Sequence, residues 1–135
     1  MTKDTEMRPN EVSYKVIGSA MNVHSALSAG LLESAYEKAL GCEFTRATLQ
    51  YRRQVRLSVD YGGVKISPAY TVDFVVESCV VVEIKAVTTV LPVHRAQLLS
   101  YLKLMNLPIG LLINFNVPHL RDGIQRFINA PETDL

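Results

Sequence analysis

Residues 70–85 read YTVDFVVESCVVVEIK, two short apolar runs separated by Glu77-Ser78-Cys79. Runs of this length, rich in valine and bounded by polar residues, are typical of strands, and a continuous valine run indicates burial on both faces. A three-residue loop makes the two runs an antiparallel hairpin in which Val76 lies opposite Val80. This hairpin is the predicted centre of the domain.

Three ionisable residues interrupt the apolar character of this hairpin. In the register set by a three-residue loop, Asp73 lies opposite Glu83, and Lys85 shares the face of Glu83 because strand side chains alternate. A two-residue loop would place the two carboxylates on opposite faces. Charged groups in an apolar strand need a partner or a function.

The rest of the chain surrounds the hairpin with helices and further strands. Apolar spacing of three and four residues predicts helices over 10–28 and 31–50, and Pro92 begins a third over 92–106. Strands are predicted over 55–61, 65–76, 80–87 and 109–115, with Gly62-Gly63 as a hairpin turn and Pro68 at an edge or bulge. A closing helix is predicted over 120–129.

A helix between strands 80–87 and 109–115 makes those two strands parallel, whereas the earlier strands form an antiparallel meander. The sequence therefore predicts an α/β (α+β) fold, with a mixed four-stranded sheet flanked by helices and an extra helix at each end.

Composition limits the possible classes of protein. A chain of 135 residues with 48% hydrophobic and 20% charged residues predicts one globular domain over 10–130, a flexible segment over 1–9 and a tail over 131–135. A net charge of +1 gives no overall attraction to nucleic acid. No apolar run approaches the roughly 20 residues of a membrane span, so we expect a cytoplasmic protein without a membrane partner. Cys42 and Cys79 are expected to be packed thiols.

The predicted juxtaposition of Asp73 and Glu83 points to a metal. Two carboxylates opposite one another repel unless a cation or a proton lies between them. Oxygen ligands suit Mg²⁺ or Mn²⁺, and a neighbouring Lys85 could orient water or stabilise charge on a phosphate. This pattern is typical of metal-dependent phosphodiester hydrolysis.

The spacing of Asp73 and Glu83-Ile84-Lys85 resembles the D…(D/E)xK signature of the PD-(D/E)xK nuclease superfamily, whose core order is αβββαβ. Residues 30–36, GLLESAY, resemble the motif of the bacterial GxxExxY family within it. The likeness extends through Arg53-Gln54-Val55 and residues 92–101 and covers about 10–130. It departs from the pattern at Val72, where the superfamily has proline, and at Thr71, where the family usually has a basic residue.

The resemblance implies roles for individual residues. Metal ligands would be Asp73, Glu83, the Ile84 carbonyl and Glu33. Lys85 would be the catalytic cation, and Gln97 would act in a QxxxY motif that ends at Tyr101. Nucleic acid, DNA or RNA, would be contacted by Arg53, His94, Arg95 and Tyr101.

Several alternatives stay open at this stage. Glu37 could replace Glu33 as the helical ligand. Asp73, Glu83 and Lys85 could form a buried ion network without chemistry, in a catalytically inactive domain that binds nucleic acid or a protein partner. The chain could also act as a homodimer.

Overall fold

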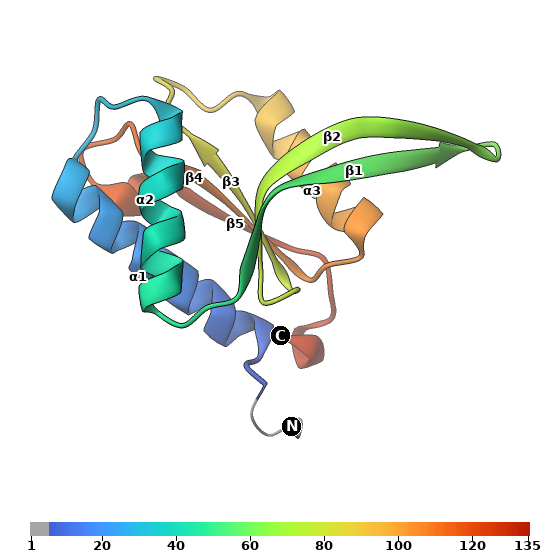
Figure 1. The fold of residues 1–135 in the computed structure, drawn as a ribbon, viewed down its shortest axis with the longest axis horizontal. Coiled ribbons are helices and arrows are strands. Elements are labelled where there is room, and N and C mark those ends of the chain that lie inside the picture. The colour runs from blue at the N-terminus through green and yellow to red at the C-terminus, as the bar shows by residue number, and fades with distance from the viewer. Residues whose placement is uncertain (1–5) are drawn as a thin grey trace.

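The computed structural model describes residues 6–135, so most of the expected flexible segment, residues 1–5, lies outside the described residues (Figure 1). The elements, in chain order, are α1 (Pro9–Leu27), α2 (Glu33–Arg46), β1 (Tyr51–Tyr61), β2 (Val64–Val76), β3 (Val80–Lys85), α3 (Pro92–Met105), β4 (Ile109–Asn114), the 3₁₀ turn η2 (Leu120–Gly123), β5 (Ile124–Ile128) and the 3₁₀ turn η3 (Glu132–Asp134). The α2-β1-β2-β3-α3-β4 series is the restriction-endonuclease-like αβββαβ core.

The five strands form one mixed sheet in the order β1-β2-β3-β4-β5. β3 and β4 are parallel over their full lengths, from Val80 opposite Ile109 to Lys85 opposite Asn114. The other neighbouring pairs are antiparallel. The parallel pair predicted from the helical crossover is therefore confirmed.

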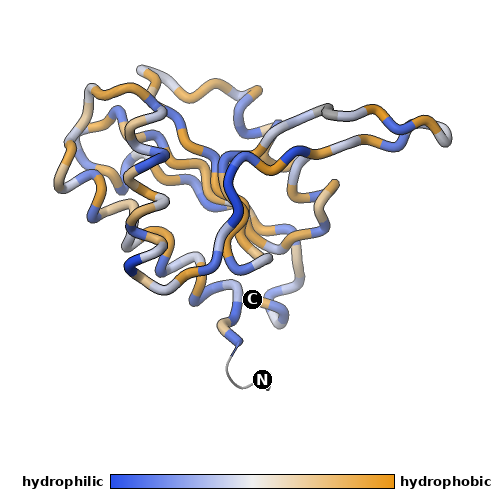
Figure 2. Tube along the Cα trace, in the orientation of Figure 1, coloured by the Kyte–Doolittle hydropathy of each residue, from blue (hydrophilic) through white to orange (hydrophobic). Residues whose placement is uncertain are grey.

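Helices cover both faces of the sheet, so the fold has three layers (Figures 1 and 2). On one face α1 and α2 pack against strand residues such as Phe74, Val82 and Leu111. On the other face α3 packs against Val81 and Leu112. Every residue of β4 is buried, as its apolar sequence predicts for a strand covered on both faces.

The end of the chain corrects the sequence prediction. Residues 120–129 were expected to form a helix, but Gly123 ends a short 3₁₀ turn and Ile124–Ile128 is a strand. This strand pairs antiparallel with β4, so the sheet has five strands rather than four. The physical reason is the open edge of β4, whose main-chain groups need a partner that a helix could not provide.

The segment predicted as a C-terminal tail folds back on the domain. The Leu135 carbonyl accepts a hydrogen bond of 3.0 Å from the Asn10 amide, and the Leu135 side chain is buried in the core. The structure also exposes Cys42, where a packed thiol was expected, because this residue lies on the outer side of α2; Cys79 is half-buried. In the part of the chain that the structure describes, no helix is long and apolar enough to span a membrane.

Replacing Gly123 by alanine should destabilise the fold by about 1–3 kcal/mol. A Cβ at this position would overlap the main-chain oxygen of Asn114, which cannot move without disturbing β4. Gly18→Ala is the matched control, since a Cβ there meets nothing and alanine is favoured in a helix by about 1 kcal/mol. In urea unfolding, the two substitutions should thus change the free energy of unfolding in opposite directions. Equal effects of the two variants would contradict this packing.

Candidate functional site

The predicted carboxylates lie where β2 and β3 separate. The ladder between these strands runs from Val76 opposite Val80 to Phe74 opposite Val82 and ends there. The three-residue loop is therefore confirmed, and Asp73 and Glu83 are the next residues in register. β2 leaves with β1 while β3 continues beside β4, so the two strands diverge at this point.

Asp73 and Glu83 bridge this divergence with their side chains. The Asp73 amide donates to Glu83 Oε1 at 2.8 Å, and the Ile84 amide donates to Asp73 Oδ2 at 2.8 Å. Each carboxylate thus accepts a hydrogen bond from a main-chain amide of the opposite strand. In a continuous ladder, a main-chain carbonyl would be the acceptor of that hydrogen bond. The crossed pair holds the two carboxylates close together.

Burial disfavours ionisation of both groups. The pKa of Asp73 is raised to about 6, chiefly by burial, and the charges of the Glu37 and Glu33 carboxylates contribute to the rise. The hydrogen bonds from Ile84 and Gln54 act in the opposite direction. A carboxyl group that resists ionisation in this way gains from a nearby cation.

The pKa of Glu83 is raised further, to about 8, by burial and then by the charge of Asp73. The hydrogen bond from the Asp73 amide and the charge of Lys85 lower it only in part. Glu83 is only 9% exposed, so solvent screens little of this repulsion. Without a metal, the pair therefore holds a proton near neutral pH.

A second set of side chains joins helix α2 to this pair. Gln54 Nε2 donates to both carboxylate oxygens of Glu37, at 2.9 and 3.0 Å, and to Asp73 Oδ1 at 3.2 Å. Arg53 forms an ion pair of 2.7 Å with Glu37. Gln54 has a left-handed backbone with φ of 50°, a conformation that only a few per cent of non-glycine residues adopt. The sequence did not identify Gln54 as a site residue, although it lies between Arg53 and Val55 in a recognised motif.

The two helical carboxylates have different environments. Glu33 is the first residue of α2 and is exposed, and its charge raises the pKa values of Asp73 and Glu83. Glu37 is buried and held by Gln54 and Arg53. Glu33 is therefore free to turn towards an ion, whereas Glu37 already has two partners.

Lys85 ends β3, where the following loop is fixed by Asn114. The Asn114 side chain accepts from the Val87 amide at 3.1 Å and donates to the Val87 carbonyl at 2.9 Å, and the Phe115 amide donates to the Lys85 carbonyl. Lys85 is half-buried, and its charge lowers the pKa values of Glu83 and His94. These contacts give Lys85 a fixed main chain beside Glu83.

Of the site residues expected on α3, Gln97 is accessible, whereas the others already have hydrogen-bond or packing partners. Gln97 is exposed, whereas Arg95 donates through Nε to Gln125 at 2.8 Å. His94 Nδ1 accepts from the Leu91 amide, and burial followed by the charge of Lys85 lowers the pKa of His94. Tyr101 is only 6% exposed.

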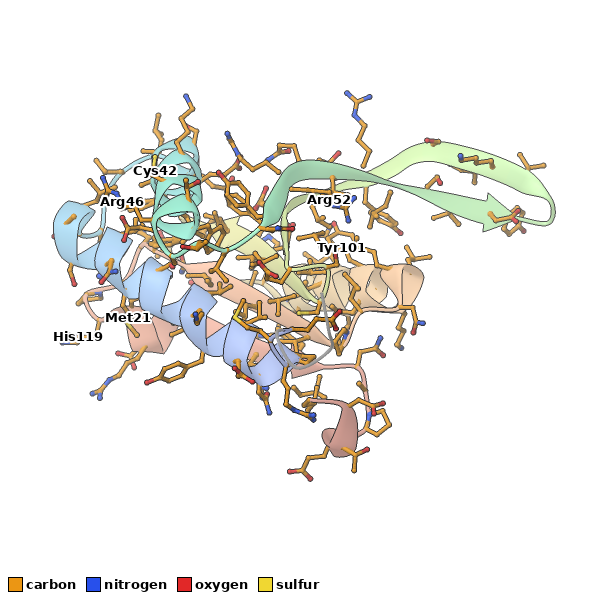
Figure 3. The ribbon with its side chains drawn as sticks, turned by 60° about the horizontal axis from the view of Figure 1, so that its bottom comes forward. Met21, Cys42, Arg46, Arg52, Tyr101 and His119 are labelled. Atoms are coloured by element: carbon orange, nitrogen blue, oxygen red, sulfur yellow. The ribbon has the colours of Figure 1, made fainter. Side chains whose placement is uncertain are left out.

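Tyr101 faces the β1–β2 ribbon (Figure 3), and its ring centroid lies 4.8 Å from that of Tyr70. This placement differs from the expected nucleic-acid contact, because an aromatic ring packed in the core has no free face for a base. A tyrosine at this helical position is compatible with either packing or nucleic-acid contact, so the sequence alone could not separate the two.

The donor set fits a hard divalent ion in part. Two carboxylates and the neighbouring Ile84 carbonyl are oxygen donors, which Mg²⁺ and Mn²⁺ prefer, and a cation would relieve the repulsion at Asp73 and Glu83. Within residues 6–135, however, no three acidic, histidine or cysteine side chains converge closely enough to hold an ion. A third side-chain ligand would require Glu33 to change rotamer.

Comparison with protein-family models places this arrangement in a known class. Residues 10–127 match the model of the PD-(D/E)XK nuclease superfamily, which is most of the chain. The chain therefore belongs to the PD-(D/E)XK nuclease superfamily, whose members usually use divalent metal ions and act on nucleic acid. Neither the curated proteins nor the solved structures give a match.

Replacing Gln54 by alanine should destabilise the protein by about 1–3 kcal/mol, because the buried Glu37 and the half-buried Asp73 lose their shared donor. Gln54→Glu should be more destabilising at pH above 8 than at pH 5, since it adds a further negative charge. Gln50→Ala, at an exposed residue of the same segment, is the control and should change stability by less than about 0.5 kcal/mol. Urea unfolding of Gln54→Ala that matches this control would contradict the bridging role.

Proposed function

We propose that the chain is a Mg²⁺- or Mn²⁺-dependent nuclease that hydrolyses phosphodiester bonds of nucleic acid. The observation that supports this most directly is the crossed pair of the half-buried Asp73 and the buried Glu83, whose carboxylates lie together where β2 and β3 diverge, with the charge of Lys85 nearby. A structural ion pair would need no second carboxylate, and replacement by apolar residues would usually be at least as stable.

In this proposal Asp73, Glu83, the Ile84 carbonyl and Glu33 hold the ion. The ion, when bound, supplies positive charge that activates water and stabilises the phosphate. Lys85 stabilises the negative charge that develops on the phosphate oxygens, and its own charge acts on Glu83 closely enough to lower the pKa of that carboxyl.

Residues around the carboxylates would position the nucleic acid. Gln97, exposed on α3, is proposed as a catalytic residue that orients the attacking water or a phosphate oxygen. Arg53, with a side chain 41% exposed beyond its ion pair, and Arg95 and His94 at the start of α3 are proposed backbone contacts. Tyr101 would act by packing against Tyr70 rather than by touching nucleic acid.

The motif of residues 30–36 favours the GxxExxY family within the superfamily, and residues 10–130 are proposed as a single domain. A cytoplasmic location remains a prediction from the sequence.

A catalytically inactive domain that binds nucleic acid or a protein is the second candidate. It is favoured by the hydrogen bonds that Asp73 and Glu83 make to main-chain amides, which already give these carboxylates a structural use. It is also favoured by the lack of three converging metal-ligand side chains in the described residues.

A cleavage assay distinguishes the two candidates. The protein is incubated with single- and double-stranded DNA and RNA in Mg²⁺, in Mn²⁺ and in chelator. We expect cleavage of at least one substrate in Mn²⁺ that stops with chelator and is absent from an Asp73→Asn preparation purified in parallel. Folded protein that binds these nucleic acids without cutting any of them would favour the inactive domain.

A further inference from the structure

The connection between α1 and α2, residues 28–32, is exposed and has an unusual main chain. Ser28 has φ of 60° and Gly30 has φ of 101°. A left-handed main chain is unfavourable for any residue other than glycine. Helix α2 then begins at Glu33, after Leu32, whose side chain cannot cap the first turn. The connection therefore needs support from elsewhere in the chain to keep one conformation.

The Tyr36 hydroxyl group provides this support. It donates a hydrogen bond to the Ser28 carbonyl at 2.6 Å and accepts one from the Leu31 amide at 3.1 Å. The two bonds use the hydroxyl group once as a donor and once as an acceptor. They fix the main chain on both sides of Gly30, so a side chain in the first turn of α2 stabilises the connection that leads into that helix.

The position of Tyr36 is itself fixed by the core. The residue is fully buried, and its ring stacks on that of Phe115, with centroids 4.6 Å apart and an interplanar angle of 10°. Phe115 follows β4, and its amide donates to the Lys85 carbonyl at 2.9 Å. Tyr36 therefore joins the start of α2 to the end of β3, which lie near one another in Figure 1.

Packing alone does not require the hydroxyl group of Tyr36. A phenylalanine ring would fill the same space and would stack on Phe115 in the same way. A buried hydroxyl group costs free energy unless it forms hydrogen bonds. Its two partners are main-chain groups of the connection, Ser28 and Leu31, rather than groups of the core. The hydroxyl group thus indicates that one particular conformation of residues 28–32 matters.

The conformation of this connection determines where α2 begins and hence where Glu33 lies. The next turn of the helix has separate support, because Gln54 and Arg53 bind the Glu37 side chain. The first turn has no side-chain cap, so its main chain depends on the bonds that Tyr36 makes. The hydroxyl group therefore acts on the part of α2 that carries Glu33.

Glu33 lies within electrostatic reach of the carboxylate pair. Its charge acts on both Asp73 and Glu83, although its carboxylate must change rotamer to join them at an ion. A rotamer change brings a ligand to the correct position only when the main chain that carries it is fixed. A fixed start of α2 is thus what a third ligand from this helix would need.

We propose that Tyr36 is a positioning residue, whose hydroxyl group fixes the α1–α2 connection so that the Glu33 carboxylate can reach an ion held by Asp73 and Glu83. The residue supplies no ligand itself and acts through Glu33. The use of this position at an ion rests on the proposed function, whereas the contacts of the hydroxyl group do not.

Amide hydrogen exchange in chelator tests the positioning without a metal. The Leu31 amide, two residues before Glu33, donates to the Tyr36 hydroxyl group. In Tyr36→Phe this amide should exchange at least about tenfold faster than in the wild type, because the connection opens locally. Tyr51→Phe is the matched control, since it also loses a hydroxyl contact, at 3.3 Å from Thr45, and should leave Leu31 exchange unchanged.

A double-mutant cycle on Mn²⁺ affinity tests the use of this position at the ion. In isothermal calorimetry at about pH 8, Glu33→Gln and Tyr36→Phe should each weaken binding by about tenfold. The double variant should lie within about twofold of Glu33→Gln, since the hydroxyl group acts only through that carboxylate. Tyr51→Phe should bind Mn²⁺ as the wild type does.

A change in the connection itself should have the same effect without altering the core. A Cβ at Gly30 would meet nothing within 4 Å, but φ of 101° is unfavourable for alanine. Gly30→Ala should therefore weaken Mn²⁺ binding by at least about fivefold. Gly63→Ala introduces a similar strain, with φ of 84° in open space at the β1–β2 turn, and should leave binding unchanged. Both proteins should keep the wild-type circular dichroism spectrum.

Three results would overturn the inference. They are wild-type exchange of Leu31 in Tyr36→Phe, additive losses of about a hundredfold in the double variant, and equal effects of Tyr36→Phe and Tyr51→Phe. A wild-type chain that binds no Mn²⁺ would instead contradict the proposed function. Faster Leu31 exchange in Tyr36→Phe would even then support the role of the hydroxyl group, so the two proposals can fail separately.

Discussion

Lys85→Ala should lower metal-dependent cleavage by about 10²–10⁴-fold while leaving affinity for Mn²⁺ within about threefold. The Lys85 ammonium is the cation that β3 places beside Glu83, and its charge lowers the pKa of that carboxyl. Its loss removes stabilisation of charge on the phosphate but removes no oxygen donor from the ion. The effect should therefore fall on the rate of cleavage and not on metal binding.

Lys103→Ala is the matched control, since Lys103 is an exposed lysine in the last turn of α3. Its cleavage rate should equal that of the wild type within about twofold, which corresponds to less than about 0.5 kcal/mol. Single-turnover rates with a saturating substrate separate chemistry from binding. Wild-type activity in Lys85→Ala would remove this residue from the proposed mechanism, and equal losses in both variants would indicate a general effect of charge.

A second large effect is expected for the stability of the metal-free protein when the pH is changed. The free energy of unfolding of the metal-free protein should fall as the pH rises from about 4 to about 8. Asp73 and Glu83 have pKa values of 3.8 and 4.5 in an unfolded chain and about 6 and about 8 in the fold, so the folded state binds more protons over this range. The stabilising contribution of the two carboxyl groups is therefore fully present below their pKa values in the unfolded chain, and it is lost as the pH rises through their pKa values in the fold. The free energy of unfolding falls by up to about 1.4 kcal/mol per pH unit for each proton by which the two states differ.

Urea unfolding at several pH values checks this dependence. Glu83→Gln should flatten the fall, because the amide cannot ionise, and Glu6→Gln, at an exposed position, should not. Saturating Mn²⁺ should stabilise the wild type more at pH 8 than at pH 5, since the ion binds the ionised carboxylates. An unchanged slope in Glu83→Gln would show that another group causes the dependence.

The sequence pattern of residues 70–85 correctly predicted the hairpin at the centre of this fold. The length of the loop set the register of Val76 and Val80, and the apolar β3 and β4 sequences indicated burial on both faces. These features depend on local pattern and on the crossover rule, which act within one or two neighbouring elements.

Other features depend on contacts between distant parts of the chain. β5 forms because β4 has an open edge, and the sequence of residues 120–129 alone suits a helix as well. Gln54 joins Glu37 to Asp73 from a left-handed backbone, which no spacing rule predicts. The divergence of β2 from β3 likewise arises from tertiary structure, so the crossed hydrogen bonds of Asp73 and Glu83 could not be predicted.

The central claim is that Asp73 and Glu83 together bind a divalent ion, and titration of the metal-free chain with Mn²⁺ tests it most directly. Isothermal calorimetry at about pH 8, near the folded pKa of Glu83, should detect one site per chain. Asp73→Asn and Glu83→Gln should each weaken that site by at least about tenfold, the smallest loss typical of changes around a metal. Glu43→Gln, at a half-buried carboxylate on α2, should leave it unchanged. A folded wild-type protein that binds no Mn²⁺ at millimolar concentration, or a site that survives both substitutions, would contradict the claim.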